Sequence, residues 1–492
     1  MLILGQGGTG KSMLIGAITE TFKFYGQENI LAKCATTGIA ATDIGGQTLH
    51  SWAGIQIRRK KNDETGDRSG KGGQKKRRKN MEGKHFLIID EISMANKKLL
   101  YSASEAVLKC RGEQGIGSAE EPFGSMHVIL AGDLHQFPPV GNSATALYVD
   151  NLSKDTRDEL LGREIFKQFE TVVILKEQIR VKDKIWMGIL NRLRIGQCSG
   201  DDIDTIRKLV LPNEECDIPD FSKRPWSEAT LITARHGVKD EWNYQAVRKH
   251  CKTTGNVKYV APAQDINRET GEEPSAEARL AIAKKAAEDT GNLEDNIDLA
   301  VGMKAMIQAN ISVEASIANG TRGVIEEIIL DPLEDAVHEI DEDGVVRLKY
   351  PPAMVLFRPN NPTSIRFPGI PEGLIPLTPT KATFTVEGRD GKKHKIARKQ
   401  YPLVPGYAFT DYKSQGQTIE CVIIDIGKPL FGHLSPFGVY VALSRSRGRE
   451  TIRLLRDFDD KLFQNHPSEE LRIEMERLEA LDKDDLARRN EV

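Results

Sequence analysis

Gly5-Gln-Gly-Gly-Thr-Gly-Lys11-Ser12 follows the apolar run Met1–Leu4 and decides the fold of this chain. The eight residues fit the pattern G-x-x-x-x-G-K-[ST], in which glycines let backbone N–H groups point at phosphate oxygens. Apolar residues then recur at helical spacing, namely Leu14, Ile15, Ile18 and Phe22. A loop between a strand and a helix N-terminus is an anion site, so we interpret it as a nucleotide-binding loop rather than a chance glycine-rich turn.

Two side chains of this loop are expected to act on the nucleotide directly. Lys11 adds positive charge for the outer phosphates, and the hydroxyl of Ser12 can hold Mg²⁺. The other contacts are expected from the loop itself, that is from Gly5, Gly7, Gly8, Thr9 and Gly10.

Two carboxylates follow the apolar run Leu87–Ile89. A strand end opposite a phosphate loop is where the Mg²⁺-holding aspartate of a P-loop ATPase belongs, which indicates Asp90 as a metal ligand. Glu91, one residue on, can orient and deprotonate the attacking water. An ordinary polar strand end is the alternative, and it is common where an Asp-Glu pair stands alone.

A proline-rich segment, Ala131-Gly-Asp133-Leu-His-Gln136-Phe-Pro-Pro139, follows another apolar run. Gln136 can hydrogen-bond the terminal phosphate or its water, and the proline pair stiffens the segment. A Pro-bounded turn explains the same residues, and spacing alone does not decide between the two interpretations.

Small hydroxyl residues and two rings follow the second candidate strand, in Ala35-Thr-Thr-Gly-Ile-Ala-Ala41 and Thr48-Leu-His50-Ser-Trp52. Hydroxyl and N–H groups suit the phosphates of a nucleic-acid backbone, and His50 or Trp52 can stack on a base. For Trp52 taken alone, a position in the core is the better interpretation.

The composition is that of a globular protein with several domains. The chain has 492 residues, of which 28% are charged and 6% aromatic, and no apolar stretch is long enough to cross a bilayer. The six cysteines form no C-x-x-C pair, which argues against a zinc ribbon or a disulfide framework and suits a reducing compartment. No His-x-His or H-E-x-x-H motif indicates a histidine metal site.

The net charge of −2 hides a basic stretch. Arg58–Lys84 holds twelve Lys or Arg and four Asp or Glu, a local charge of +8, so a polyanion must be met by local patches. We expect a mobile loop there, because the stretch lacks periodicity. Lys75–Lys79 can contact DNA or act in nuclear import; a solvated insert is the favoured alternative.

The chain alternates strand and helix patterns in two blocks. In the first block the expected strands are Ile30–Ala35, Phe86–Ile89 and Met126–Ala131. A second block begins near Phe169 and is built from Val172–Leu175, a helix over Trp186–Leu193, Leu231–Thr233, Val422–Ile426 and Val439–Leu443. Within the second block, the stretch from Gly302 to Arg398 predicts a small inserted β unit of short strands, including Val345–Tyr350, Met354–Phe357 and Ala382–Val386. Residues 468–484 predict an amphipathic helix with Leu471, Met475 and Leu478 on its apolar stripe.

Three later segments complete the pattern: Gln178-Ile-Arg180, Tyr407–Thr418 and Val439–Arg445. An arginine delivered from a second domain to a nucleotide on the first stabilises charge in the transition state. A lone arginine is usually a solvated surface residue, so only the order of the segments points to Arg180 and Arg445.

That order resembles the Pif (petite integration frequency) DNA helicases, of superfamily one with RecD-like relatives. GQGGTGKS, ATTGIAA with TLHSW, IIDEISM, GDLHQFPPV, QIR, KSQGQT and YVALSR are similar to the ordered motifs of that family, from Gly5 to about Phe458. GMKAMI and Asn319–Gly323 look like its lead-in to an inserted SH3-like unit. YAFTDYKSQGQTI and IRLLRDFDDKLF are similar to its large fungal, transposon-associated branch.

The resemblance implies a fold and a set of site residues. The fold class is α/β: two RecA-like P-loop domains with a small SH3-like β insertion in the second. The expected bounds are 1–155 for the first domain, 156–324 and 399–460 for the second, 325–398 for the insertion and 461–492 for a charged helical tail. Catalytic roles fall to Glu91, Gln136, Arg180 and Arg445, with Gly416 at the nucleotide and Ser12 and Asp90 on the metal. Strand contacts fall to Thr36, Thr37, His50, Trp52, Asn319, Lys413, Ser414, Gln415 and Thr418.

The resemblance also implies an ATP- and Mg²⁺-dependent helicase that moves 5′-to-3′ on single-stranded DNA. Expected partners are single strands and forks, with no membrane; the expected state is a monomer in the nucleus or, alternatively, the mitochondrion. Repair, recombination and telomere maintenance are the expected settings. Family members carry an adenine-reading segment before the loop, whereas this sequence starts at the strand, so a DNA-binding remnant with little ATPase activity is the alternative. A P-loop ATPase that does not use nucleic acid is the third interpretation.

Overall fold

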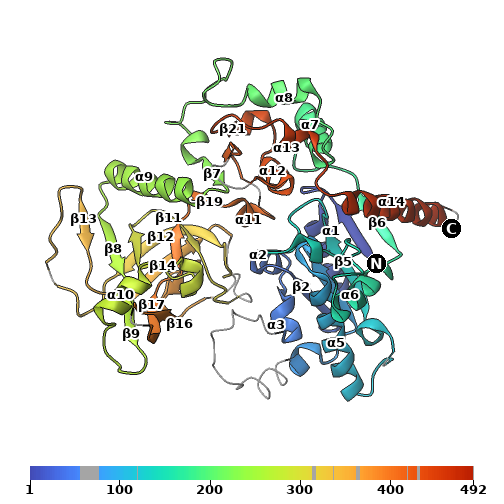
Figure 1. Cartoon of the computed structure of the whole chain (residues 1–492), viewed down its shortest axis with the longest axis horizontal. Coiled ribbons are helices and arrows are strands. Elements are labelled where there is room, and N and C mark those ends of the chain that lie inside the picture. The colour runs from blue at the N-terminus through green and yellow to red at the C-terminus, as the bar shows by residue number, and fades with distance from the viewer. Residues whose placement is uncertain are drawn as a thin grey trace. The chain divides into compact units, whose positions relative to one another are not determined.

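The computed structural model describes residues 1–55, 77–118, 120–312, 317–335, 337–361, 366–389, 391–417, 419–428 and 433–490. They form two compact units (Figure 1). Unit 1 holds the described residues up to 239 and from 409 onward, and unit 2 holds those from 240 to 408.

Unit 1 contains a six-stranded parallel sheet in the order β3-β2-β4-β5-β1-β6. Its strands are β1 Leu2–Gly5, β2 Leu31–Ala35, β3 Gln47–Thr48, β4 Phe86–Asp90, β5 His127–Gly132 and β6 Val172–Leu175. The helices between them are α1 Lys11–Phe24, α2 Gly38–Asp43, α3 Leu49–Ala53, α5 Lys97–Glu113 and α6 Arg157–Lys167. The central strands are buried on both faces, which explains why they read as continuous apolar runs.

The three strands predicted for the first block are confirmed to within a residue or two. The position predicted for Val172–Leu175 is wrong, because this strand pairs with β1, with Leu2 beside Val172, and not with the second block. As β6 it is the last strand of the first sheet. The pairing joins residues far apart in the sequence, so local pattern gave no sign of it.

Helix α14, Glu469–Asn490, covers the free edge of β6 and confirms the predicted tail helix. The backbone N–H groups of Val172 and Ile174 donate to Asp485 and Asp482 at 2.7 and 2.9 Å. These carboxylates take donors that an edge strand otherwise leaves unpaired. The predicted apolar stripe, Leu471, Met475 and Leu478, is buried in the core of the first sheet.

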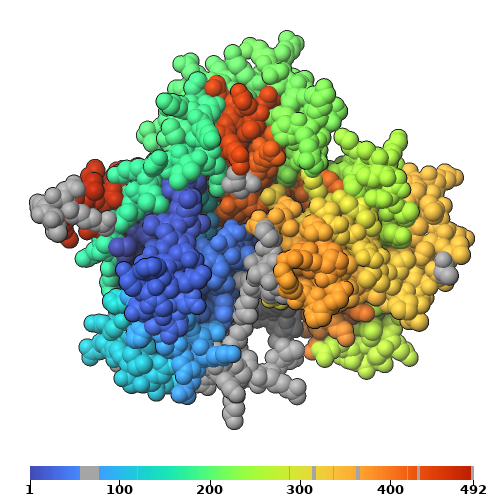
Figure 2. Space-filling view, turned by 180° about the vertical axis from the view of Figure 1, so that it is seen from behind, coloured from blue at the N-terminus to red at the C-terminus, as the bar shows by residue number. Residues whose placement is uncertain are grey.

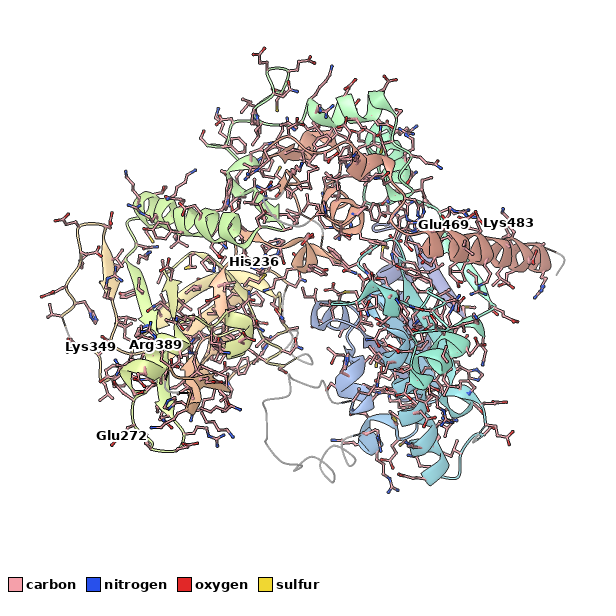
Figure 3. The ribbon with its side chains drawn as sticks, viewed as in Figure 1. His236, Glu272, Lys349, Arg389, Glu469 and Lys483 are labelled. Carbon is pink, nitrogen blue, oxygen red and sulfur yellow. The ribbon has the colours of Figure 1, made fainter. Side chains whose placement is uncertain are left out.

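The polar face of α14 is exposed, as its charge predicted. Its far end extends beyond the body of unit 1 in Figures 1 and 2, where it is dark red. Glu469 and Lys483, labelled in Figure 3, are both exposed and stand near the start and in the second half of the helix.

The second sheet of unit 1 has the order β19-β7-β20-β21. Its strands are β19 Ala408–Phe409, β7 Thr230–Thr233, β20 Val422–Asp425 and β21 Ile452–Leu454, of which β7, β20 and β21 are parallel. The helices of this part of unit 1 are α7 Lys184–Arg194, α8 Gly200–Arg207, α11 Asp411–Ser414, α12 Pro436–Leu443 and α13 Lys461–Gln464. Helix α9, His236–Thr254, begins at the end of unit 1, and most of it belongs to unit 2. The strand expected at Val439–Leu443 is wrong: the segment lies in α12, whose residues from Phe437 onward are all buried. A helix buried on every side is apolar all round, so its sequence carries no helical period.

Unit 2 is dominated by antiparallel strands. A five-stranded sheet has the order β15-β14-β12-β11-β18, with β11 Lys304–Ile307, β12 Arg322–Ile329, β14 Met354–Pro359, β15 Ile375–Leu377 and β18 Leu403–Pro405. Two smaller sheets are built from β8 Lys258–Pro262, β9 Gln264–Asn267, β10 Asn296–Leu299, β13 Val345–Arg347, β16 Thr380–Glu387 and β17 Lys393–Gln400. Helix α10, Ala276–Ile282, also belongs to this unit. The three strands predicted in this region are present as β13, β14 and β16, and the segment 325–398 predicted as an insertion lies within this unit.

Two substitutions on α14 test its role as a part of the core. Leu478 is fully buried, so Leu478→Ala is expected to lower the free energy of unfolding of the chain by about 2–5 kcal/mol. Leu486 on the same helix is 53% exposed, and Leu486→Ala should change it by no more than about 0.5 kcal/mol. Urea unfolding followed by circular dichroism measures both; equal effects of the two substitutions would contradict the packing.

Candidate nucleotide site

The loop between β1 and α1 has the backbone geometry of a phosphate cradle. Gly8 and Gly10 have φ of 95° and 86°, a left-handed region that favours glycine. Gly10 is also the N-cap of α1, and no side chain caps the helix there. The first N–H groups of α1 therefore face the loop, where a helix N-terminus attracts anions.

The side chain of Lys11 curls into this loop. Its Nζ donates to the carbonyl oxygens of Gly5 and Gln6 at 2.8 and 3.1 Å. Burial lowers the pKa of Lys11, while the carboxylates of Asp133 and Glu91 oppose that shift. A charged ammonium at the mouth of the loop is the arrangement predicted for contact with outer phosphates.

Asp90 ends β4 and Glu91 follows it, and β5 separates β4 from β1 in the sheet. Both are buried, and Glu91 has a φ of 53°, a costly conformation for a residue with a side chain. Burial, followed by the neighbouring Glu91, raises the pKa of Asp90 to about 7. A cation beside Asp90 would offset the cost of its buried charge.

Magnesium fits these residues. It is bound in proteins by one or two carboxylates together with phosphate oxygens, and Asp90 and Ser12 both line the pocket. Across the parts of the chain that the structure describes, no group of three or more His, Cys, Asp or Glu forms a metal site.

Three predicted catalytic residues meet beside Gly7. A methyl group placed on Gly7 would lie 3.2 Å from Nη2 of Arg445 and 3.4 Å from both Nη1 of Arg180 and Nε2 of Gln136. They enclose, with the loop, a cavity of about 400 Å³. Its lining includes Gly7, Gly8, Gly10, Lys11, Ser12, Asp90, Glu91, Gln136, Arg180, Gly416 and Arg445. The structure thus brings together the loop, the carboxylates and the two arginines.

The two arginines are held in place by the backbone of unit 1. Arg445 is 1% exposed, and its Nε and Nη1 donate to the carbonyl oxygens of Val441 and Gln417 at 2.8 and 3.1 Å. Arg180 donates from Nη1 to the carbonyl oxygen of Ser444 at 3.2 Å. Burial, and then the charge of Arg180, lowers the pKa of Arg445 to about 9. Two close cations, one buried and one half-buried, favour an anion between them.

Gln178 is a site residue that sequence reasoning missed. Its Nε2 donates to the carbonyl oxygen of Gly7 at 3.1 Å. The backbone N–H of Ile179 donates to the carbonyl oxygen of Gly8 at 2.9 Å. The segment carrying Arg180 is therefore fastened to the loop itself. Its place two residues before Arg180 was the only signal in the sequence.

Asp133 was also missed, although it stands in the same segment as Gln136. It is fully buried and accepts from Nη2 of Arg194 at 2.6 Å and from the hydroxyl of Tyr440 at 3.1 Å. Burial alone would raise the pKa of Asp133, but Arg194 and then Lys11 hold it well below its usual range. This carboxylate joins the end of β5 to α7 and α12, which belong to the second block.

The predicted strand contacts fall into several environments. Trp52 is 3% exposed within the core of the first sheet, so the core interpretation is correct and its ring is not free to stack on a base. His50 is half-buried, and burial lowers its pKa. The hydroxyl of Thr37 caps α2, and that of Thr36 donates to the carbonyl oxygen of Glu91 at 2.8 Å.

Among the predicted strand contacts later in the chain, Gln415 contacts the predicted general base. Gln415 is buried, and its Nε2 donates to Oε2 of Glu91 at 3.0 Å. Ser414 is fully buried, with its hydroxyl donating to Asp411, and Lys413 is half-buried. Asn319 is a half-buried residue of unit 2, and Thr418 lies outside the described residues.

These features define a P-loop nucleotide-binding protein in which segments next to two β-sheets contribute residues to one site. Residues 1–184 match the family model described as PIF1-like helicase. The chain is 26% identical over 465 residues to ATP-dependent DNA helicase PIF1 of Xenopus laevis, covering 94% of this chain and 60% of that protein. It is 26% identical over 492 residues to ATP-dependent DNA helicase RRM3 of Saccharomyces cerevisiae, covering 92% of this chain and 62% of the relative. The chain thus spans about three fifths of the length of these relatives.

Solved structures show the same fold. The crystal structure of Pif1 helicase from Candida albicans has a TM-score of 0.63 at 24% identity and covers 98% of this chain and 95% of its own. That of Pif1 helicase from Bacteroides in complex with ADP-AlF3 and ssDNA has a TM-score of 0.63 at 21% identity, covering 97% and 92%. The predicted class, two RecA-like α/β domains, is confirmed.

The left-handed glycine in the loop gives a direct test of the cradle. Gly8→Ala adds a Cβ where φ is 95° and within 2.6 Å of Cβ of Arg180, so the affinity for a fluorescent ATP analogue should fall about tenfold or more. Gly16→Ala, on α1 with no atom within 4 Å, should bind as tightly as wild type. Unchanged affinity of Gly8→Ala in an equilibrium titration would refute the cradle.

The buried carboxylate gives a test of stability. Asp133→Asn removes the fully buried counter-charge of Arg194, whose own side chain is 15% exposed, and this is expected to cost about 3–5 kcal/mol. Asp158, which pairs with Lys98 at 3.4 Å on the surface, provides the control, and Asp158→Asn should cost no more than about 1 kcal/mol. Chemical denaturation of both variants decides the matter; similar losses would mean that Asp133 holds nothing together.

Proposed function

We propose that the chain is an ATP-dependent DNA helicase that translocates 5′-to-3′ on single-stranded DNA. The observation that carries this proposal is the convergence of Arg180, Arg445 and Gln136 on the loop at Gly7. A nucleotide there touches groups from both sheets, so its hydrolysis changes how the two sheets are held together. That DNA is the substrate is proposed from the similarity to relatives named DNA helicases.

The residues of the site divide the chemistry among themselves. Lys11 and the loop backbone bind the phosphates, and Ser12 with Asp90 would hold Mg²⁺, which neutralises charge on the transferred phosphoryl group when bound. Glu91 accepts the proton of the attacking water, and Gln136 orients that water or the terminal phosphate. Arg180 and Arg445 stabilise the charge that develops on the leaving phosphate.

Translocation follows from the arrangement of the two sheets. ATP binding draws the arginines toward the phosphates and closes the site, and hydrolysis removes the anion that held them. Alternate grip of the strand by the two RecA-like parts then advances the chain along it. Two of the predicted strand contacts, Thr37 and Lys413, lie beside α2 and in α11, which follow strands of the first and second sheet.

The biological setting is proposed from the relatives and from sequence. Partners are single strands and forks, and the chain acts as a monomer in the nucleus, or alternatively in the mitochondrion, in repair, recombination or telomere maintenance. The motif order supports superfamily one with RecD-like relatives, and the segment around Lys413 supports the fungal, transposon-associated branch. The inserted unit at 325–398 is proposed to be SH3-like. Among the described residues, no helix is long and apolar enough to cross a membrane.

Purified protein tests the function through ATP hydrolysis with and without oligo-dT. The wild type should hydrolyse ATP faster when the strand is added, and Glu91→Gln should lower the stimulated rate by about 10²–10⁴-fold while still binding nucleotide. Lys11→Ala should lose nucleotide binding as well. A duplex with a 5′ single-stranded tail should be unwound and one with a 3′ tail should not.

Three results would oppose the proposal. A rate of ATP hydrolysis that oligo-dT leaves unchanged would indicate a P-loop ATPase that does not use nucleic acid. Strand binding with no turnover would indicate a remnant. Unwinding of the 3′-tailed duplex alone would reverse the polarity.

A further inference from the structure

One hydrogen bond joins a predicted strand-contacting residue to the predicted general base. Nε2 of Gln415 donates to Oε2 of Glu91 at 3.0 Å, and both side chains are buried. Oε1 of Glu91 lies on the side of Gly416, 3.9 Å from where a Cβ on that glycine would stand. One lone pair of the carboxylate is therefore occupied, and the side chain is turned toward the segment 411–417.

Gln415 is itself poorly satisfied in this position. Its Oε1 is buried without a hydrogen-bond partner among the residues that the structure describes. A buried amide that leaves its carbonyl unpaired loses free energy relative to one that is paired at both ends. The amide is therefore placed to leave Glu91 when another partner is offered.

The same segment also holds Arg445. Nη1 of this arginine donates to the carbonyl oxygens of Ser414 and Gln417 at 3.4 and 3.1 Å. A shift of residues 411–417 thus moves the contacts of the base and of the arginine together. The other hydrogen bonds of the Arg445 side chain go to Val441 and Ser444, which form no hydrogen bond with Glu91.

An aromatic surface on this segment is suited to a nucleic-acid base. The ring of Tyr412 stacks on Phe137 with centroids 3.9 Å apart and planes 16° from parallel. Phe137 is buried, whereas Tyr412 is 48% exposed. An exposed ring that is fixed by stacking on one face offers the other to a base, and Lys413 next to it supplies charge for a phosphate.

We propose that Gln415 is a positioning residue that restrains Glu91 while no strand is bound. Contact of a single strand with Tyr412 and Lys413 moves the segment, draws the amide of Gln415 away and frees the carboxylate to accept the proton of the attacking water. This proposal rests on the proposed function and deepens it, because it names the contact through which the strand speeds hydrolysis.

The test is the rate of ATP hydrolysis by Gln415→Leu without and with oligo-dT. Loss of a hydrogen bond to a charged group corresponds to about tenfold, so the strand-free kcat should rise by about tenfold. The kcat with saturating oligo-dT should stay near that of wild type, and the stimulation ratio should fall accordingly. The KM for ATP should not change, because Gln415 does not line the nucleotide pocket.

A matched control breaks a bond of the same kind elsewhere. Gln245 donates to Glu241 at 2.8 Å on the exposed face of α9, and Gln245→Leu should leave both rates unchanged. Gln415→Asn, which keeps the amide but is too short to reach Glu91, should act in the same direction as leucine. Melting curves of both Gln415 variants show whether the chain still folds, and Gln415→Asn decides the matter if the leucine variant does not.

The outcomes separate the two proposals. A rise in strand-free kcat with a lower stimulation ratio supports the inference. A strand-free kcat that is unchanged or lower, in a chain whose wild type is stimulated by oligo-dT, overturns the inference and leaves the proposed function standing. A wild type that oligo-dT does not stimulate overturns the proposed function, and the inference with it.

Discussion

The space beside Gly7 is the point on which the site depends. Nitrogen donors of Arg445, Arg180 and Gln136 approach it from three different segments, and a side chain at this position would displace them. Two of the donors are cations that repel each other, the buried Arg445 and the half-buried Arg180, so the arrangement is stabilised most when an anion lies among them. The loop and the arginines therefore act together in binding an anion.

The second constraint is the contact that holds the loop and the arginines in their relative positions. Asp133, at the end of the strand that neighbours β1, is fully buried and accepts from Arg194 and Tyr440, which stand on α7 and α12. Its partner Gln136 lies in the same turn, 3.4 Å from Oδ2. A carboxylate so enclosed is costly to separate from its donors. The candidate nucleotide site is thus tied to the helices of the second sheet by a fully buried carboxylate.

The sequence predicted the elements of the first sheet because a phosphate loop and apolar runs of strand length are local signals. It misplaced Val172–Leu175, whose pairing with β1 joins residues about 170 positions apart. It misread Val439–Leu443 as a strand, since a fully buried helix has no polar face and hence no period. The candidate catalytic groups were predicted from motif order, and the structure brings them together at one pocket. Gln178 and Asp133 were not predicted, because their partners are backbone or side chains that only the folded chain brings close.

The most direct measurement of the central claim is a crystal structure of the chain with ADP, aluminium fluoride, Mg²⁺ and oligo-dT. The account predicts that the guanidinium groups of Arg180 and Arg445 both donate to the fluoride atoms, with Gln136 beside them and Asp90 close to the metal. A complex in which the fluoride sits at the loop while either arginine remains out of hydrogen-bonding distance would contradict it.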